Sequence, residues 1–158
     1  MKILCVLYDD PKSGMPKSYP LSNLPKLEKY PDGMTLPNPK GRDFTPGELL
    51  GCVSGELGLR KFLESNGHEY IVTNSKDGDG NEADKHIVDA DIVISQPFFP
   101  YYLTKEKIAK AKNLKMAITA GIGSDHVDLQ AAMDNNIDVV EVTFCNSRSV
   151  AEHIVMMI

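Results

Sequence analysis

The chain has 158 residues, of which 42% are hydrophobic and 25% are charged, and its formal net charge is -5. This length and composition are typical of one globular domain with its own core. The acidic balance argues against nucleic acid as a partner, and no apolar run is long enough to span a membrane. Three cysteines at wide spacings favour reduced thiols and a cytoplasmic location.

A proline-rich segment occupies residues 8–46. All of the prolines except Pro97 and Pro100 lie in it. Proline removes a backbone donor and restricts φ, so this segment cannot consist of helices or inner strands. Apolar residues recur along it, and they favour an ordered segment that wraps over a surface instead of a disordered loop. They are Tyr19, Leu21, Leu24, Leu27, Tyr30, Met34 and Leu36.

The rest of the chain alternates between short apolar strands and helices. Strands are expected at residues 2–7, 69–73, 91–95, 115–119 and 138–140. Helices are expected at residues 48–66, 81–88, 104–112 and 128–135, the first ending at Gly67 and the last two capped by Thr104 and Asp128. Short apolar strands joined by helices predict an α/β fold, with a flavodoxin-like parallel five-stranded sheet and helices on both faces.

A last helix is expected to begin near Ser147. Ser149 can serve as its N-cap, with Glu152 three residues later as the capping-box partner. The apolar run 154–158 then follows without a stop signal, and a helix that is apolar all round is normally buried. We therefore expect residues 1–146 to form one domain, and residues 147–158 to start a hinge helix into a second, missing domain.

A candidate anion site follows from the segments that come after the strands, because ligands of doubly wound sheets bind at the carboxyl ends of strands. Gly121 and Gly123 would form a sharp turn that exposes the Ile122 N–H. Asn146 follows the fifth strand and offers two amide donors. Donors in an apolar cup suit a small carboxylate. The apolar wall would consist of Pro97, Phe98 and Phe99.

An alternative interpretation is that the same residues have structural roles only. The glycines could form a simple turn, Asn146 a helix cap and the two phenylalanines core, and the residues alone favour this view. The glycine pair is not a dinucleotide fingerprint, because His126 occupies the third glycine position and the next helix begins only near Asp128. The histidines and cysteines lack the spacing of zinc ligands, so we expect no metal.

Two stretches of the sequence resemble the D-2-hydroxyacid dehydrogenase superfamily. Residues 119–129 are similar to its T-x-G-x-G-x-D-x-[IV]-D pattern, and residues 146–153 are similar to its N-x-x-[SA]-V-A-E pattern. Within the superfamily, the chain most resembles the bacterial NAD-dependent formate dehydrogenases. That similarity extends over essentially the whole chain, including the proline-rich segment, and is carried by residues 4–11, 43–47, 53–61 and 95–98.

The resemblance implies the substrate-binding part of a homodimeric enzyme that transfers hydride from formate to NAD+, giving carbon dioxide and NADH. It implies that the Ile122 N–H and the Asn146 amide bind formate, that Pro97 and Phe98 limit the pocket to a one-carbon acid, and that Ser147 contacts the cofactor. The family's catalytic arginine and histidine and its main NAD-binding residues would lie beyond this chain. We therefore expect no catalytic residue and no activity in residues 1–158 alone.

Two alternatives remain open. One is a dehydrogenase that acts on a D-2-hydroxy acid, against which the proline-rich segment and residues 96–99 argue. The other is a freestanding flavodoxin-like binding module without catalysis, which would be a monomer.

Overall fold

The computed structural model describes residues 1–7 and 59–158. The chain divides into two compact units, one made of Met1–Tyr8 and Ile71–Ile158, the other of Asp9–Tyr70. The proline-rich segment and most of the helix expected at residues 48–66 lie outside the described residues. The described part of that helix is α2 (Leu59–Ser65), and Gly67 after it has a φ of 75°, which confirms the expected stop.

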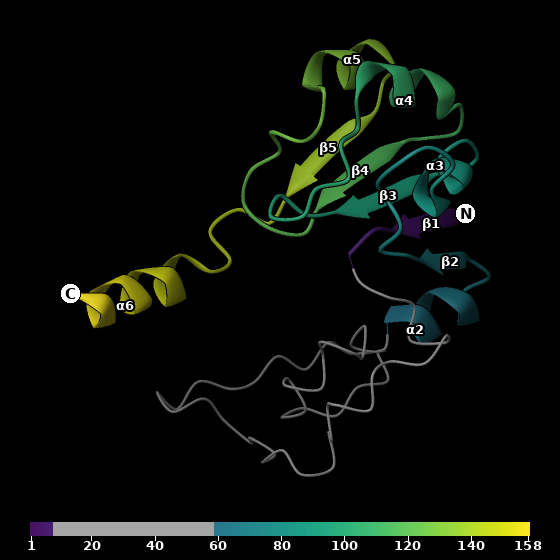
Figure 1. The fold of residues 1–158 in the computed structure, drawn as a ribbon. Helices are drawn as coiled ribbons and strands as arrows, with labels where there is room; N and C mark the ends of the chain where they lie inside the picture. The colour runs from purple at the N-terminus through teal and green to yellow at the C-terminus, as the bar shows by residue number, and fades with distance from the viewer. Residues whose placement is uncertain (8–58) are drawn as a thin grey trace. The chain divides into compact units, whose positions relative to one another are not determined.

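Five strands form one sheet in the order β2-β1-β3-β4-β5 (Figure 1). The pairs β1·β3, β3·β4 and β4·β5 are parallel. The predicted α/β class and flavodoxin-like order are therefore confirmed. The strands are β1 (Lys2–Cys5), β2 (Glu69–Val72), β3 (Ile92–Ser95), β4 (Met116–Thr119) and β5 (Asp138–Glu141).

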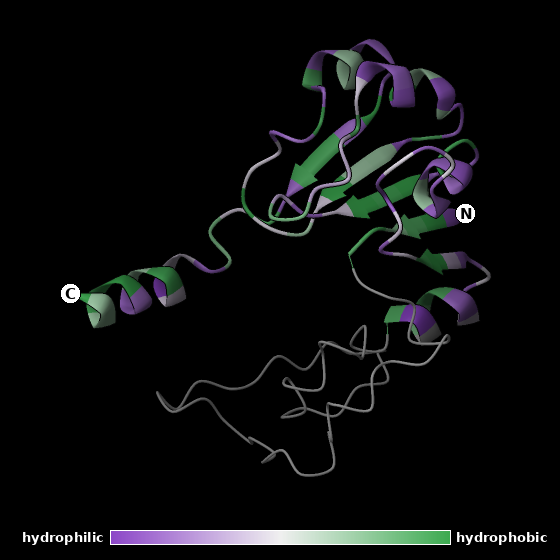
Figure 2. Ribbon diagram, viewed as in Figure 1, coloured by the Kyte–Doolittle hydropathy of each residue, from purple (hydrophilic) through white to green (hydrophobic). Residues whose placement is uncertain are grey.

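One face of the sheet carries the core. Side chains alternate along β3 and β4, so that Val93 and Ala117 are fully buried, and the strands stand out as hydrophobic in Figure 2. They form one apolar cluster with residues in and beside α3 (Glu82–His86), α4 (Lys105–Lys110) and α5 (Leu129–Asp134). Burial of this apolar surface is the main driving force for folding the unit. Ile94 and Ile118 alternate with the core residues and are half-buried. The helices expected over that second face stay a prediction.

The N-cap residues mark where each loop ends and the following helix begins. Asn81 accepts a hydrogen bond from the backbone N–H of Asp84 at 2.8 Å, at the start of α3. Asp128 accepts one from the N–H of Ala131 at 2.9 Å, as predicted, so α5 begins well after the glycine pair. Thr104 occupies the N-cap position of α4, but its side chain makes no capping hydrogen bond.

The last helix, α6 (Ser147–Met157), has Asn146 at its N-cap position. The expected start near Ser147 is confirmed, whereas the expected capping box of Ser149 and Glu152 is wrong. Ser149 lies inside the first turn, and Glu152 accepts instead from Arg148 Nε at 2.9 Å, an i,i+4 pair along the helix. No residue of α6 is buried. None of the helices in the described ranges is both long and apolar enough to cross a membrane.

Candidate functional site

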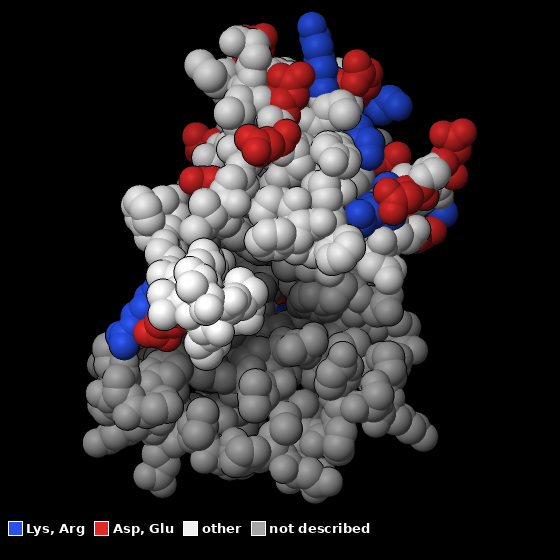
Figure 3. All heavy atoms as spheres, turned by 60° about the vertical axis from the view of Figure 1, so that its left-hand side comes forward, with Lys and Arg blue, Asp and Glu red and all other residues white. Residues whose placement is uncertain are grey.

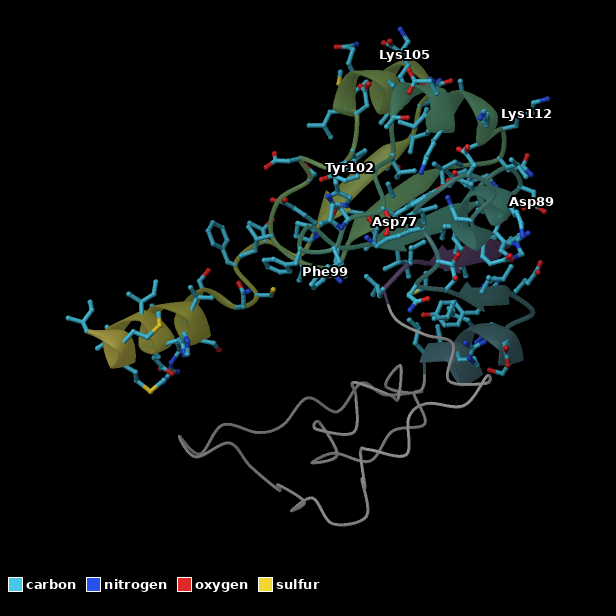
Figure 4. The ribbon with its side chains drawn as sticks, in the orientation of Figure 1. Asp77, Asp89, Phe99, Tyr102, Lys105 and Lys112 are labelled. Carbon is cyan, nitrogen blue, oxygen red and sulfur yellow. The ribbon has the colours of Figure 1, made fainter. Side chains whose placement is uncertain are left out.

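The candidate site lies at the carboxyl end of the sheet. Figure 4 shows Phe99 beside the end toward which the arrows of β3 and β4 point, with Asp89 and Lys112 at the opposite end. Backbone hydrogen bonds continue past the strand ends: the Ala120 N–H donates to the Ser95 carbonyl at 2.7 Å. The segments after β3 and β4 therefore lie side by side, as the sequence predicted for a parallel sheet.

Gly121 brings the apolar wall and the glycine turn together. It is buried, and a Cβ at this position would lie 3.1 Å from Pro97 Cδ and 3.2 Å from Pro97 Cγ. Phe98 Cε2 would be 3.9 Å from the same point. The backbone can approach the proline ring this closely only because residue 121 has no side chain. Two of the predicted wall residues thus contact the predicted turn.

The Ile122 N–H is available to a ligand. None of the residues in the described ranges accepts a hydrogen bond from it. The Ile122 side chain is 42% exposed, and Gly123 has a φ of 96°, which a residue with a side chain rarely adopts. The turn therefore offers one free donor beside an apolar side chain, the geometry expected of it from the sequence.

The backbone N–H of the next residue, Gly123, is hydrogen-bonded to Glu141, a residue that the sequence analysis did not identify. The N–H of Gly123 donates to Glu141 Oε2 at 2.6 Å. Glu141 is the last residue of β5, whereas the strand was expected to end at Val140. The signal that could have identified it is an acidic residue at the carboxyl end of a strand, next to a glycine turn.

Asn146 follows the fifth strand, but not at the strand end itself. β5 ends at Glu141, and a turn separates it from Asn146. The reason is local: Phe144 adopts a φ of 62° and redirects the chain before α6 begins. Asn146 is half-buried, and its side chain accepts no hydrogen bond from the helix backbone. Its amide is therefore not used for capping. Ser147, the expected cofactor contact, is the exposed first residue of α6.

The two phenylalanines are not core residues. Phe98 is 71% exposed and Phe99 is 70% exposed. The structural interpretation that assigned them to the core is therefore wrong. Exposed aromatic side chains beside a free backbone donor are consistent with the wall of a binding site. Figure 3 shows charged side chains mixed over the upper part of the described surface, and a largely uncharged surface between them and α6.

A buried polar pair lies behind the turn. Ser95 Oγ and His126 Nε2 are 2.6 Å apart, and the two residues are 2% and 4% exposed. Burial lowers the pKa of His126, and the nearby charge of Asp125 partly opposes this effect. Thr119, which faces Ser95 in the register of β3 and β4, is also fully buried. Sequence reasoning treated His126 only as the residue that interrupts a glycine pattern, although polar residues ending two apolar strands were a usable signal.

Within the part of the chain that the structure describes, no group of His, Cys, Asp and Glu side chains could hold a metal ion. The chemistry available at this edge of the sheet is that of neutral hydrogen-bond donors, apolar side chains and the carboxylate of Glu141. Donors beside apolar side chains suit a small anion.

Comparison with known proteins identifies the family. The family model described as "D-isomer specific 2-hydroxyacid dehydrogenase, catalytic domain" matches residues 56–155. Formate dehydrogenase of Pseudomonas sp. (strain 101) is 68% identical over 157 residues, which cover 99% of this chain and 39% of that protein. A formate dehydrogenase structure from Granulicella M. has a TM-score of 0.75 at 64% identity and covers 99% of this chain and 42% of its own.

A third relative carries a cofactor. The structure of NAD-dependent formate dehydrogenase from Staphylococcus aureus in complex with NAD has a TM-score of 0.65 at 40% identity, over 99% of this chain and 37% of that one. The chain thus spans about two fifths of the length of these relatives. The resemblance to formate dehydrogenases inferred from the motifs is confirmed. The chain belongs to the family of D-isomer specific 2-hydroxyacid dehydrogenases, whose catalytic-domain model it matches.

Proposed function

We propose that this chain supplies the substrate-binding part of an NAD-dependent formate dehydrogenase. The observation that carries the proposal is the 68% identity to the Pseudomonas formate dehydrogenase over 99% of the chain. The match spans the segments that contain the glycine turn, the wall and Asn146, and not one motif alone. The overall reaction takes formate and NAD+ to carbon dioxide and NADH, so that hydride leaves the formate carbon and no separate proton is transferred.

The residues of this chain would bind and orient formate. The Ile122 N–H and the Asn146 amide are neutral donors that suit the two carboxylate oxygens. Held by both, formate would present its C–H bond in one direction, and orientation of this kind can lower a barrier substantially. Nicotinamide, when bound, supplies the hydride acceptor. The Ser147 hydroxyl, exposed at the first position of α6 and adjacent to Asn146, fits a polar contact to the cofactor.

The apolar wall would contribute to both rate and specificity. Formate carries a negative charge and carbon dioxide does not, so replacing water by Pro97, Phe98 and Phe99 favours loss of the charge. The close packing of Pro97 on Gly121 sets this wall directly against the glycine turn. A D-2-hydroxy acid is larger by at least one carbon and its substituents, and we propose that the wall excludes it.

A homodimer and a cytoplasmic location belong to the same proposal. The resemblance to formate dehydrogenases supports the first, together with the apolar residues that α6 exposes, such as Val155 and Met156, which are 72% and 76% exposed. An odd number of widely spaced cysteines supports the second.

The test is a substrate comparison on the full-length protein that contains this chain. NADH formation would be measured with formate, and NADH oxidation with glyoxylate and hydroxypyruvate. We expect turnover with formate and little with the two larger acids. Preference for the larger acids would instead support a D-2-hydroxyacid dehydrogenase, and no turnover with any of them would support a binding module.

A further inference from the structure

A carboxylate lies beside the proposed formate site. Glu141 Oε2 accepts the N–H of Gly123 at 2.6 Å. Gly123 follows Ile122 in the chain, so their amide nitrogens are at most about 4 Å apart. An anion that accepts the Ile122 N–H would therefore lie within about 10 Å of Glu141 Oε2, which is also the Debye length at about 0.1 M salt. The charge of Glu141 is thus close enough to act on a bound anion.

No cation of the described residues compensates the charge of Glu141. The ion pairs that these residues form with one another do not include it. Its second oxygen, Oε1, accepts the hydroxyl of Thr143 at 3.3 Å, which is a neutral donor. The side chain is exposed, and an exposed carboxylate is ionised at neutral pH.

The sequence around the site adds no positive charge. Lysine and arginine are absent from the segments that follow β3, β4 and β5, which are residues 96–103, 120–127 and 142–147. Asp125, in the second of these segments, adds another exposed carboxylate. Arg148, the next basic residue along the chain, donates to Glu152 at 2.9 Å within α6. In the part of the chain that the structure describes, this edge of the sheet is therefore acidic, although the proposed substrate is an anion.

A negative charge at this place acts more strongly on bound formate than on the transition state. Formate carries a full negative charge, which leaves with the hydride as carbon dioxide forms. Repulsion by Glu141 therefore raises the free energy of bound formate more than that of the transition state. The carboxylate weakens binding of the substrate and does not oppose the reaction that follows.

We propose that Glu141 determines the affinity of the formate site, because its negative charge weakens the binding of anions there. This inference rests on the proposed function. The role belongs to the charge and not to the hydrogen bond from Gly123, since a glutamine carbonyl could accept the same N–H. Removal of the charge should strengthen anion binding, whereas damage to the site would weaken it.

The test measures the KM for formate, and inhibition by nitrate against formate, in the full-length protein. Nitrate is a planar, singly charged ion with oxygen acceptors and no hydride to transfer. We expect Glu141→Gln to lower the KM for formate and the inhibition constant of nitrate about threefold each, without an increase in kcat. Glu141→Lys should lower both further. Glu141→Asp, which keeps the charge, should stay within about twofold of the wild type.

The effect should also depend on ionic strength, because salt screens exposed charges. We expect the nitrate inhibition constants of Glu141→Gln and the wild type to converge as the salt concentration rises from about 0.05 M to about 0.5 M. A change in the shape of the site would not produce this convergence. A threefold difference that persists at the higher salt concentration would overturn the role of the charge.

Asp138 provides the matched control. It is an exposed acidic residue at the first position of β5, about 10 Å along the strand from Glu141. Asp138→Asn removes the same charge at this greater distance, so the KM for formate and the nitrate inhibition constant should match the wild type. An equal fall of both constants in Asp138→Asn would overturn the inference, because the net charge of the protein would then be the cause.

The outcomes separate this inference from the proposed function. Absence of formate turnover in the wild type would contradict the proposed function itself. Formate turnover in the wild type, with an unchanged or raised KM for formate in Glu141→Gln, would overturn the role of the Glu141 charge alone.

Discussion

Ser95 and His126 form a buried hydrogen bond of 2.6 Å that connects the end of β3 to the loop after β4. Ser95 immediately precedes the segment of the apolar wall, and His126 ends the segment that contains Ile122. The Ser95 carbonyl also accepts the Ala120 N–H at 2.7 Å, so side chain and backbone hold the same two segments. The pair lies in low-dielectric surroundings, where protonation of the imidazole is unfavourable.

Acidification should destabilise the fold through His126. Burial lowers the pKa of His126 below its ordinary value of 6.5. The unfolded chain then binds a proton on this group at pH values where the folded chain does not. The stability conferred by the neutral group is complete above pH 6.5, decreases as the pH falls below it, and stops decreasing below the folded pKa. Urea unfolding measured at several values between about pH 7.5 and about pH 5 tests this.

The matched pair of variants is His126→Asn and His153→Asn. We expect His126→Asn to reduce the dependence of the free energy of unfolding on pH, because the buried titrating group is gone. The His153 side chain is exposed on α6, so His153→Asn serves as the control for replacing a histidine outside the core. An identical pH dependence in the His126 variant and the wild type would contradict the prediction.

Substitution of Gly121 should strain the site. In Gly121→Ala, the new Cβ would lie 3.1 Å from Pro97 Cδ, which is tighter than most Cβ contacts, so the proline ring would have to shift. We expect a loss of about 1–3 kcal/mol in the free energy of unfolding, as for other overpacked positions. The double variant with Pro97→Ala should recover part of this loss, because the clashing ring is absent. Strictly additive losses in a double-mutant cycle would show that the two residues do not share this contact.

Asn146→Ala should impair formate turnover and leave stability unchanged. The side chain makes no capping hydrogen bond to α6, so its removal should not alter the unfolding midpoint. In the full-length protein, loss of a donor to an anion in a dry pocket should lower kcat/KM for formate. The expected loss of transition-state stabilisation is about 2–4 kcal/mol. Near-normal formate kinetics would remove Asn146 from the site, and a lowered midpoint with normal kinetics would indicate a structural role.

Residues 1–158 by themselves should not catalyse formate-dependent reduction of NAD+ and should not bind NAD measurably. In this stretch alone, the Ile122 N–H and the Asn146 amide would face water, where polar contacts to an anion are weak. By the resemblance of the motifs, the catalytic arginine and histidine and the main cofactor-binding residues would lie outside this stretch. Calorimetric titration with NAD and a turnover assay, on protein verified by mass to end at Ile158, test this. Tight NAD binding would show that the cofactor site has been misplaced.

The sequence by itself determined the sheet and the position of the glycine turn. Short apolar strands, helices between them and caps such as Asp128 are local signals, and each depends on residues only a few positions apart. The parallel order then follows because connections through helices return the chain in the same direction. The site residues Ile122 and Pro97 could be placed for the same reason, since both lie within three residues of a strand end.

Only the tertiary structure decided which atoms meet at the site. Glu141 reaches the Gly123 amide because β4 and β5 pair with Thr119 opposite Glu141, a register that no local pattern encodes. Asn146 lies beyond a turn in which Phe144 adopts a left-handed conformation, which its residue type disfavours and the residue pattern therefore did not predict. The sequence indicates which residues lie near a strand end, but a hydrogen bond of 2.6 Å depends on strand register and turn geometry together.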